Sequence, residues 1–281
     1  MGKTTDNKPF ERLVQAVSFH RGKNSSRHRT RTHPNQYLEL PLDLPTLASA
    51  TFPELKSLRL FLQSGTRPHA DKAWLHFLER HPSIEELSWH PIAPICTPNP
   101  NELLPNLKSL QTNEYFFSAL PTKAKKRLEE LDLMVISGFD VLDELSETES
   151  SLKKLRIHDP HSIGFWENAR ERVALLSPTL EYLGIFAGYH EGDVDAWVSY
   201  LARFPNLQTF RGEALWSAVG VDLDAMHQAI GSLVVGCPEL RELDHRSFDK
   251  HREGFKRIVI IREQDGETVN VRYEIKRPEM Q

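Results

Sequence analysis

A short pattern of apolar and polar positions recurs along the chain. Its clearest copies lie at 52–58, 104–110 and 204–210, each with a proline in second place and apolar residues two and five places after that proline. Weaker copies fill the intervals, so that eight copies of L-x-x-L-x-L begin at Leu55, Ile84, Leu107, Leu128, Leu152, Leu180, Leu207 and Leu240. Spacings of 21 to 33 residues between these starts indicate one structural unit repeated along the chain.

The chemistry of each copy favours a short strand. A proline two residues before the first apolar position stops a preceding helix, and it occurs in six of the eight copies. Apolar residues at the fourth and sixth positions then fall on one face of an extended segment, although the sixth position fails at Thr112, Gly212 and His245. We predict parallel strands, in chain order across one sheet, at Ser57–Phe61, Glu86–Trp89, Ser109–Gln111, Leu131–Met134, Lys154–Ile157, Tyr182–Ile185, Thr209–Arg211 and Arg241–Asp244.

Helical periodicity separates these strands. Apolar residues recur three and four places apart in Asp71–Arg80, Phe139–Leu145, Phe165–Leu176, Asp193–Phe204 and Leu223–Val235. Strands that alternate with helices at this period predict an α/β leucine-rich-repeat solenoid, with a curved parallel sheet on the concave side and helices on the convex side. In such a stack Leu155, a fourth-position residue, is expected to be buried.

The ends are predicted to differ from the repeats. Residues 1–9 are expected to be disordered, and 10–281 to form a single domain with repeats at 50–248. Val14–Phe19 resembles a weak first strand, followed by a basic flexible loop at 21–36. Lys256–Ile261 and Thr268–Ile275 alternate as strands around Asp265-Gly266, a turn signal that predicts a capping β-hairpin at 255–277.

The degenerate phrases Phe52–Leu58 and Cys237–Leu243, set in repeats of unequal length, resemble the repeat region of fungal F-box/leucine-rich-repeat proteins over about residues 50–248. The resemblance implies a substrate-recognition arc that holds a target, while an F-box docks the Skp adaptor of a cullin ubiquitin ligase. No F-box-like Leu-Pro-x-Glu/Asp start followed by helical apolar spacing precedes the repeats here, so the sequence offers the Skp adaptor no recognisable docking segment. The asparagine usual after the third leucine is absent too.

Charge and composition narrow the partner classes. The net charge is −4, but residues 1–36 hold eight Lys or Arg against two acidic residues, which gives about +6 there and about −10 elsewhere. The basic tract at 21–33 suits an acidic partner, whereas nucleic acid is not expected because no aromatic residue interleaves the tract. The polar start, the lack of a long apolar segment and two distant cysteines predict a cytoplasmic or nuclear protein without a membrane anchor.

Motifs of catalysis are not found. The glycines form neither GxGxxG nor a P-loop, no GxSxG occurs, and HExxH fails after His190-Glu191. One compact cluster of ligand-type residues, from His158 to His161, supports the alternative of an enzyme with a polar site there, but a polar strand-to-helix turn has the same composition. We therefore predict no enzyme activity, no catalytic residue, no metal site and no cofactor.

The concave face is the predicted binding surface. Aromatic and arginine side chains anchor most protein interfaces, and the register places six candidates close together: Tyr182, Phe186, Arg211, Met134, His158 and Arg156. Tyr182 and Phe186 flank Gly184, so a partner is expected to reach the backbone between the two rings. Burial of both rings by another part of this chain is the alternative. Glu130 and Asp132 are expected beside Lys154 and Arg156, in a structural or a binding role.

Overall fold

A computed structural model describes residues 51–60, 69–91, 94, 103–136, 140–147, 151–159, 165–176, 178–187, 193–212, 215, 219, 223–244, 255–262 and 269–276. The chain divides into two compact units, Met1–Ala124 and Lys125–Gln281. The predicted strand Val14–Phe19, the basic loop and His161 lie outside the described residues.

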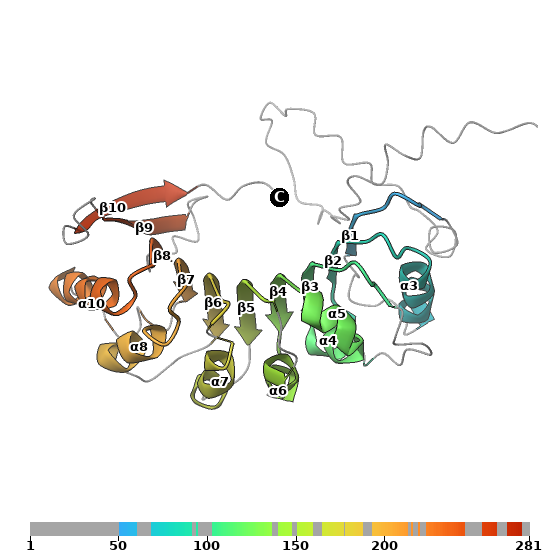
Figure 1. Ribbon diagram of the computed structural model, residues 1–281, viewed down its shortest axis with the longest axis horizontal. Helices are drawn as coiled ribbons and strands as arrows, with labels where there is room; N and C mark the ends of the chain where they lie inside the picture. The colour runs from blue at the N-terminus through green and yellow to red at the C-terminus, as the bar shows by residue number, and fades with distance from the viewer. Residues whose placement is uncertain are drawn as a thin grey trace, which may run out of the picture. The chain divides into compact units, whose positions relative to one another are not determined.

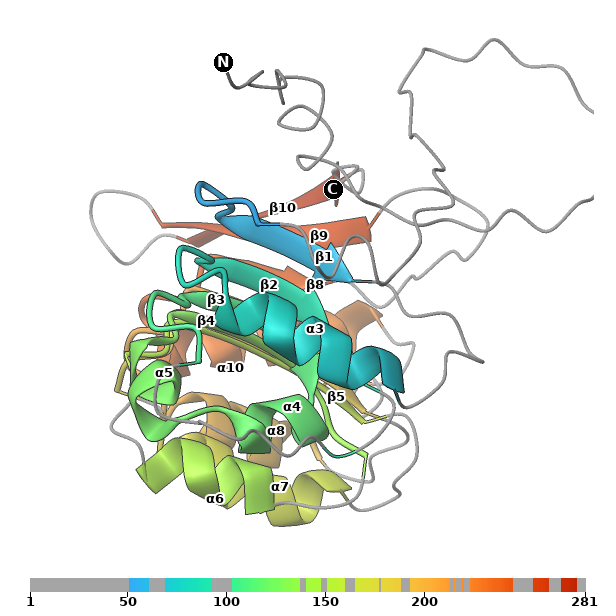
Figure 2. The same cartoon turned by 90° about the vertical axis from the view of Figure 1, so that its right-hand side faces the viewer.

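The first unit contains three parallel strands in chain order, β1 (Ser57–Leu60), β2 (Glu86–Trp89) and β3 (Ser109–Asn113). Helix α3 (His69–Glu79) connects β1 to β2 and lies on one side of the strands, as Figures 1 and 2 show. After β3 comes the short helix α4 (Glu114–Ala119). The Asn113 side chain caps α4 by accepting a hydrogen bond from the Phe116 backbone N–H.

In the second unit, the parallel strands β4 (Glu130–Met134), β5 (Lys154–Asp159), β6 (Tyr182–Ala187), β7 (Thr209–Gly212) and β8 (Glu242–Asp244) pair in chain order. Helices α6 (Asp140–Glu147), α7 (Phe165–Ala174), α8 (Val194–Leu201) and α10 (Leu223–Gly236) alternate with them and lie together on one side of the sheet (Figure 1). Antiparallel strands β9 (Phe255–Arg262) and β10 (Val269–Lys276) follow β8.

The alternation of strands and helices and the C-terminal antiparallel hairpin are confirmed within these units. The sequence pattern did not predict α4 or α5 (Thr122–Arg127). Each has only six residues, and α5 has the sequence TKAKKR, so neither shows an apolar stripe long enough to reveal a helical period. None of the described helices has the length and apolar character needed to span a membrane.

The apolar positions of the repeated phrase form the core. Every fourth-position side chain is at most 8% exposed: Leu58, Leu87, Leu110, Leu131, Leu155, Leu183, Phe210 and Leu243. Two of the sixth-position misfits, Thr112 and Gly212, are buried as well, and His245 lies outside the described residues. Thr112 is fully buried. Its Oγ1 donates a hydrogen bond to the Trp89 carbonyl oxygen at 2.5 Å, so the polar group is satisfied in the core. At Gly212 a Cβ would lie 3.0 Å from the Ile185 carbonyl oxygen, so only glycine fits there without a shift.

One backbone hydrogen-bond arrangement links successive copies. The carbonyl oxygen of the residue after the first apolar position accepts from two consecutive N–H groups of the next copy: Lys153 O accepts from Glu181 N at 2.8 Å and from Tyr182 N at 3.0 Å. The same two distances recur at the carbonyl groups of Lys56, Glu85, Glu129, Glu181 and Gln208. This shared acceptor sets the register from which each strand pairing begins.

Hydrogen bonds from side chains also link successive copies. The residue just before the first apolar position is Ser or Asn in several copies, and its side chain donates to a carbonyl oxygen of the preceding copy. Asn206 Nδ2 reaches Pro178 O at 2.8 Å, Asn106 Nδ2 reaches Pro82 O at 3.0 Å, and Ser83 Oγ reaches Pro53 O at 3.0 Å. The sequence lacks the asparagine usual after the third leucine. Side-chain hydrogen bonds between successive copies are instead made by Asn and Ser residues just before the first apolar position.

His81 joins the end of α3 to the segment before β1. The ring is 1% exposed and stacks on Phe77 with centroids 3.9 Å apart. Its Nδ1 donates to the Phe77 carbonyl oxygen at 2.6 Å, while its Nε2 accepts from the Phe52 backbone N–H at 2.7 Å. Only a neutral imidazole can do both. Burial is the main cause that lowers the pKa of His81 below its usual 6.5, and it outweighs the opposing Phe77 hydrogen bond.

We expect Leu155→Asp to destabilise the second unit by about 3–5 kcal/mol, because it places an unpaired carboxylate in an apolar core. Leu155 is 0% exposed, whereas neighbouring Lys153 is exposed, so Lys153→Asp is the control and should change the free energy of unfolding by less than about 1 kcal/mol. Chemical denaturation of both variants measures this. Equal stability of the two would show that the assigned register is wrong.

A pH dependence should follow from His81. Because its pKa is lower in the folded than in the unfolded state, the unfolded chain binds more protons as pH falls through 6.5. The contribution of His81 to stability is therefore complete above pH 6.5 and lost below it. His81→Leu should flatten the decline in melting temperature between pH 7.5 and 5. An identical decline in the wild type and His81→Leu would contradict this prediction.

Candidate functional site

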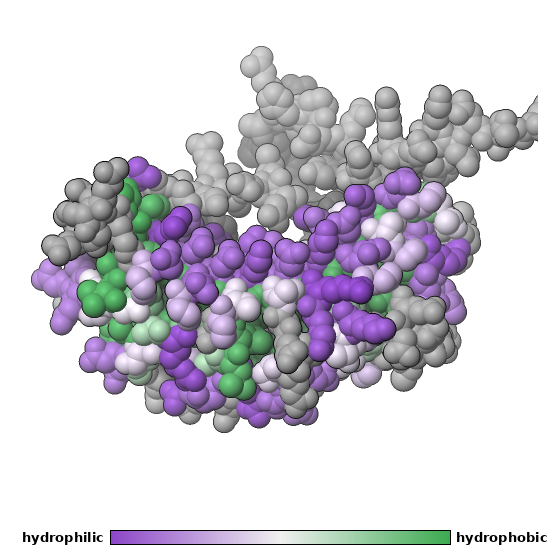
Figure 3. All heavy atoms as spheres, in the orientation of Figure 1, coloured by the Kyte–Doolittle hydropathy of each residue, from purple (hydrophilic) through white to green (hydrophobic). Residues whose placement is uncertain are grey.

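The strand face of the second unit that lies opposite its helices carries most of the predicted site. We call the surface of β4–β7 on this side the open face. Buried residues alternate with exposed or partly exposed ones along these strands, except at the buried Gly184 of β6. Asp132 and Met134 on β4 therefore face outward, while Leu131 and Leu133 are buried. Figure 3 shows hydrophilic residues gathered over this side of β4–β7, with hydrophobic residues visible over α10.

Asp132 is the polar centre of the open face. Its Oδ1 lies 2.9 Å from Nε2 of His158, and its Oδ2 lies 3.5 Å from Nη1 of Arg156. Both partners come from β5, where they are two residues apart and therefore share a face. The strand register, which places Asp132 opposite Arg156 and Met134 opposite His158, makes this arrangement possible.

Two guanidinium groups approach one tyrosine ring. The guanidinium carbon of Arg156 lies 5.0 Å from the centroid of the Tyr182 ring, and that of Arg211 lies 5.6 Å from the same centroid. Arg156 Nε also donates to the Tyr182 hydroxyl at 3.3 Å. Partial burial acts to lower the pKa of Arg156, but Tyr182 and Asp132 outweigh it, so the pKa of this guanidinium lies above its usual value.

A second ring pair extends the cluster along the strands. The His158 imidazole stacks on Phe186 with centroids 4.7 Å apart and planes 13° apart. Met134, opposite His158 in register, is 37% exposed. The structure therefore brings all six predicted residues onto adjacent strands. Tyr182 and Phe186 both remain partly exposed, so no described segment of this chain fully covers the two rings.

The surroundings of Gly184 differ from what the sequence predicted. It pairs with Arg156 on one side and Arg211 on the other, between the two aromatic residues of β6. A Cβ there would lie 3.0 Å from Phe186 Cε2, 3.2 Å from Arg156 Cγ and 3.3 Å from Tyr182 Cε1, and the residue is buried. The surrounding side chains occupy the space above the glycine. The expectation that a partner reaches the backbone here is therefore wrong, because these side chains already cover it.

The predicted charge pairs are also present. Lys154 forms an ion pair with Glu130, and Arg156 contacts Asp132, each between directly opposite residues of β4 and β5. Sequence reasoning treated Asp132 only as a partner for Arg156 and missed its contact with His158. The signal was available, because His158 lies two residues after Arg156 on the same predicted strand face.

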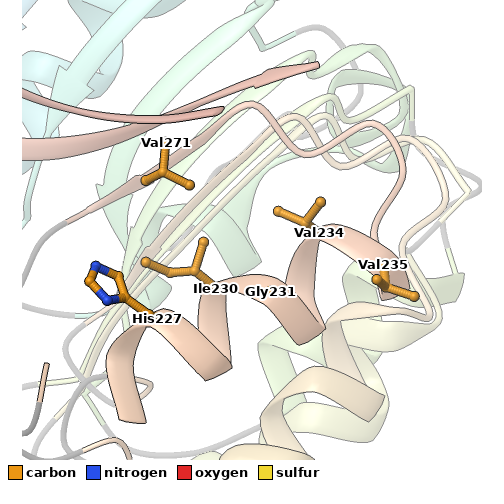
Figure 4. Close-up of a pocket in the computed structure, with 6 residues that line it drawn as sticks. All are labelled: His227, Ile230, Gly231, Val234, Val235 and Val271. Atoms are coloured by element: carbon orange, nitrogen blue, oxygen red, sulfur yellow. The ribbon is translucent and has the colours of Figure 1, made fainter. Parts of the chain in front are cut away.

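A second feature of this unit is an open apolar depression of about 320 Å³ between α10 and β10 (Figure 4). It is lined by His227, Ile230, Gly231, Val234, Val235 and Val271. Val235 is 84% exposed. Among the described lining residues His227 has the one polar side chain, so these residues do not bring together the converging polar groups that catalysis requires. Among the described residues, no group of three or more His, Cys, Asp or Glu is placed to hold a metal ion.

Comparison of the sequence with protein-family models and with curated proteins found no match.

Gly184→Ala tests the packing of the cluster. We expect it to displace the ring of Phe186 and the stem of Arg156 and to destabilise the protein by about 1–3 kcal/mol. Gly231→Ala is the control: nothing lies within 4 Å of a Cβ there, and alanine in a helix should be neutral or stabilising. Thermal melts together with near-ultraviolet circular dichroism measure both effects. A Gly184→Ala protein as stable as Gly231→Ala, with an unchanged aromatic spectrum, would rule out this packing.

Proposed function

We propose that this protein is a non-enzymatic protein-interaction scaffold, a leucine-rich-repeat solenoid whose open face is its concave recognition surface. In this role it resembles the substrate-recognition arc of an F-box ubiquitin-ligase receptor. The observation that carries the proposal is the cluster on β4–β7, where two arginines, a histidine and two aromatic rings share one partly exposed surface.

The repeated backbone geometry supports the repeat architecture. Eight copies of the phrase each place a buried fourth-position residue on a strand, and within each unit the strands follow chain order. The shared carbonyl acceptor occurs at the same position of the phrase at successive steps. Such regularity is typical of solenoids, in which each unit contacts mainly its neighbours.

The chemistry of the open face supports a protein as partner. Tyrosine and arginine are enriched among the residues that dominate binding energies at protein interfaces. Here they sit on strands whose backbone is hydrogen-bonded on both sides, so their positions are fixed before binding and little ordering cost remains. Acidic and basic residues alternate across β4 and β5, which favours recognition of a specific pattern rather than general attraction to a polyanion.

One observation favours the alternative of an enzyme with a polar site near His158 and His161. The Asp132 carboxylate lies 2.9 Å from the His158 imidazole, and a carboxylate that orients a histidine is a common part of catalytic sites. One face of the His158 ring is engaged as well, because the imidazole stacks on Phe186. We favour the scaffold, since stacking and ion pairing together hold His158 as part of a contact surface. An acidic partner for the basic tract at 21–33 stays a separate proposal.

Affinity capture from an extract of cells that make the protein tests the scaffold. The wild type should enrich a partner that the Tyr182→Ala, Arg211→Ala double variant captures at least tenfold less, because each anchor contributes more than about 1 kcal/mol. The control is Lys153→Ala, Arg241→Ala, which removes two exposed residues outside the cluster. Undiminished capture by the first double variant, or a loss of capture by the control as large as the loss by that variant, would contradict the proposal.

The same samples test the ligase connection. If the repeat region works without an F-box, the Skp adaptor should not co-purify with the wild type, and purified Skp adaptor should not bind it. Stoichiometric binding of the adaptor would instead place the chain in a ubiquitin-ligase complex.

A further inference from the structure

We propose that the protein forms a homodimer in which the β10 strands of two copies pair antiparallel about a two-fold axis at Tyr273. This interface is separate from the open face of β4–β7, so the inference goes beyond the proposed function and does not depend on it. Three features carry it: the position of β10 in the sheet, the order of charged residues along the strand, and the apolar depression beside it.

Strand β10 is the last strand in the sheet order. It pairs with β9 along its whole length, and β9 lies between β10 and β8 (Figure 1). None of the other described strands pairs with the far side of β10, which we call its outer edge. Asn270, Val271 and Arg272 are exposed. The backbone N–H and C=O groups along such an edge can form a ladder with a further strand.

The strand lacks most of the devices that keep edge strands from pairing. Edge strands that avoid pairing are commonly very short, interrupted by a proline or a bulge, or rich in lysine. Strand β10 has eight residues without a proline, pairs with β9 without a bulge, and has one lysine, Lys276, at its end. Its sequence VNVRYEIK instead places a basic residue before Tyr273 and an acidic residue after it.

The order of these charges selects one register. When two copies of a strand pair about a two-fold axis, the central residue lies opposite its own copy and its two neighbours lie opposite each other. With Tyr273 at the centre, Arg272 of each copy lies opposite Glu274 of the other, and every residue of β10 except Val269 is paired. A centre at Arg272 or Glu274 puts like charges directly opposite, which is unfavourable. Centres nearer either end shorten the ladder.

The neighbouring strands already alternate acidic and basic residues in one row. Arg257 of β9 lies opposite Asp244 of β8 on one side and opposite Glu274 of β10 on the other. Opposite charges at facing positions stabilise a sheet. In the proposed register, Arg272 of the second copy follows Glu274 in this row. The dimer therefore continues an alternation of charge that the last three strands have begun.

The apolar depression between α10 and β10 adds a hydrophobic contribution (Figure 4). Val271 lines it from β10 and is 37% exposed, and Val235 of α10 is 84% exposed. Facing residues of an antiparallel pair share one side of the sheet, so positions 271, 273 and 275 of the second copy fall on the side of Val271. These positions hold Val, Tyr and Ile. The second copy thus brings an apolar row to the side where apolar surface is exposed.

Sedimentation equilibrium of the full chain measures the dimer, and the wild type should dissociate on dilution between about 300 and 1 μM. Arg272→Glu sets acidic residues opposite each other twice in the dimer and should raise its dissociation constant about tenfold or more. Glu274→Arg should do the same with basic residues. Lys153→Glu makes the same change of charge at an exposed position outside β10 and should alter the constant by less than about twofold.

A mixture of the two charge variants is the sharper test. Each variant alone faces like charges, but in a mixed pair Arg272→Glu lies opposite Glu274→Arg and the unchanged residues also face opposite charges. The mixture should therefore form a dimer at concentrations where each variant alone is a monomer. A variant that had merely lost its fold would not be rescued in this way.

Cysteine cross-linking reports the register. Tyr273→Cys places the two new thiols opposite each other, with Cα atoms about 5 Å apart, which a disulfide can span. Val271→Cys leaves each new thiol four positions from its copy, about 14 Å away, and should not cross-link. Both variants keep Cys96 and Cys237, so the wild type under the same oxidising conditions is the control.

Several results would overturn the β10 interface. These are a dimer that Arg272→Glu does not weaken, a mixture that shows no rescue, and cross-linking at position 271 as complete as at 273. A chain that stays monomeric at every concentration would overturn it too, whether another segment of this chain or a different protein occupies the outer edge. Partner capture that depends on Tyr182 and Arg211 is a separate result, so the two proposals can fail independently.

Discussion

The rest of the structure depends on a backbone carbonyl group shared between successive repeats. In each described copy that has it, the oxygen after the first apolar residue accepts two consecutive N–H groups of the next copy, which fixes how far one strand is offset from the next. A slip of one residue would turn every side chain to the opposite face. The buried fourth-position residues therefore align, and so do the outward ones. Asp132 opposes Arg156, and Gly184 lies between Arg156 and Arg211, because this register leaves no other arrangement.

The same repetition defines a core position that the leucine pattern does not include. The residue before the phrase's proline is buried as Leu104, Phe204 and Cys237. Among the described residues, His81 and Lys125 are the polar residues that lie three places before a first apolar position, and each is compensated differently. His81 uses both ring nitrogens for backbone hydrogen bonds, and Lys125, 6% exposed, pairs with Glu144 at 2.6 Å. Burying a polar group is costly without partners, and both of these side chains have them.

The repetition explains which parts of the structure the sequence could predict. Strand positions were predictable because the phrase is periodic, and the six site residues because alternation decides which side chains share a face. Two features were not predictable. The burial of Thr112 and Gly212 was not predictable, because neither residue is a large apolar one as the pattern expects. What suits each to its position is a carbonyl oxygen of the preceding repeat, which the spacing of residues does not reveal. The side chains that cover Gly184 depend on rotamers of Phe186, Arg156 and Tyr182, which the spacing of residues does not determine.

The two faces of the second unit use their charges differently, and this difference supports the proposal that the strand side is the binding surface. On the helix side, Arg203 contacts both oxygens of Glu171 at 2.9 Å, and Arg172 pairs with Asp143 of the preceding helix, so these charges mainly hold neighbouring helices together. On the open face, Arg156 makes contacts of 3.3 and 3.5 Å and is held in place by an aromatic ring instead. A guanidinium oriented by stacking keeps N–H groups for a ligand, whereas one in a two-oxygen ion pair has already committed them. The fold thus orients the Arg156 guanidinium by an aromatic ring as well as by an ion pair, and leaves its side chain 41% exposed.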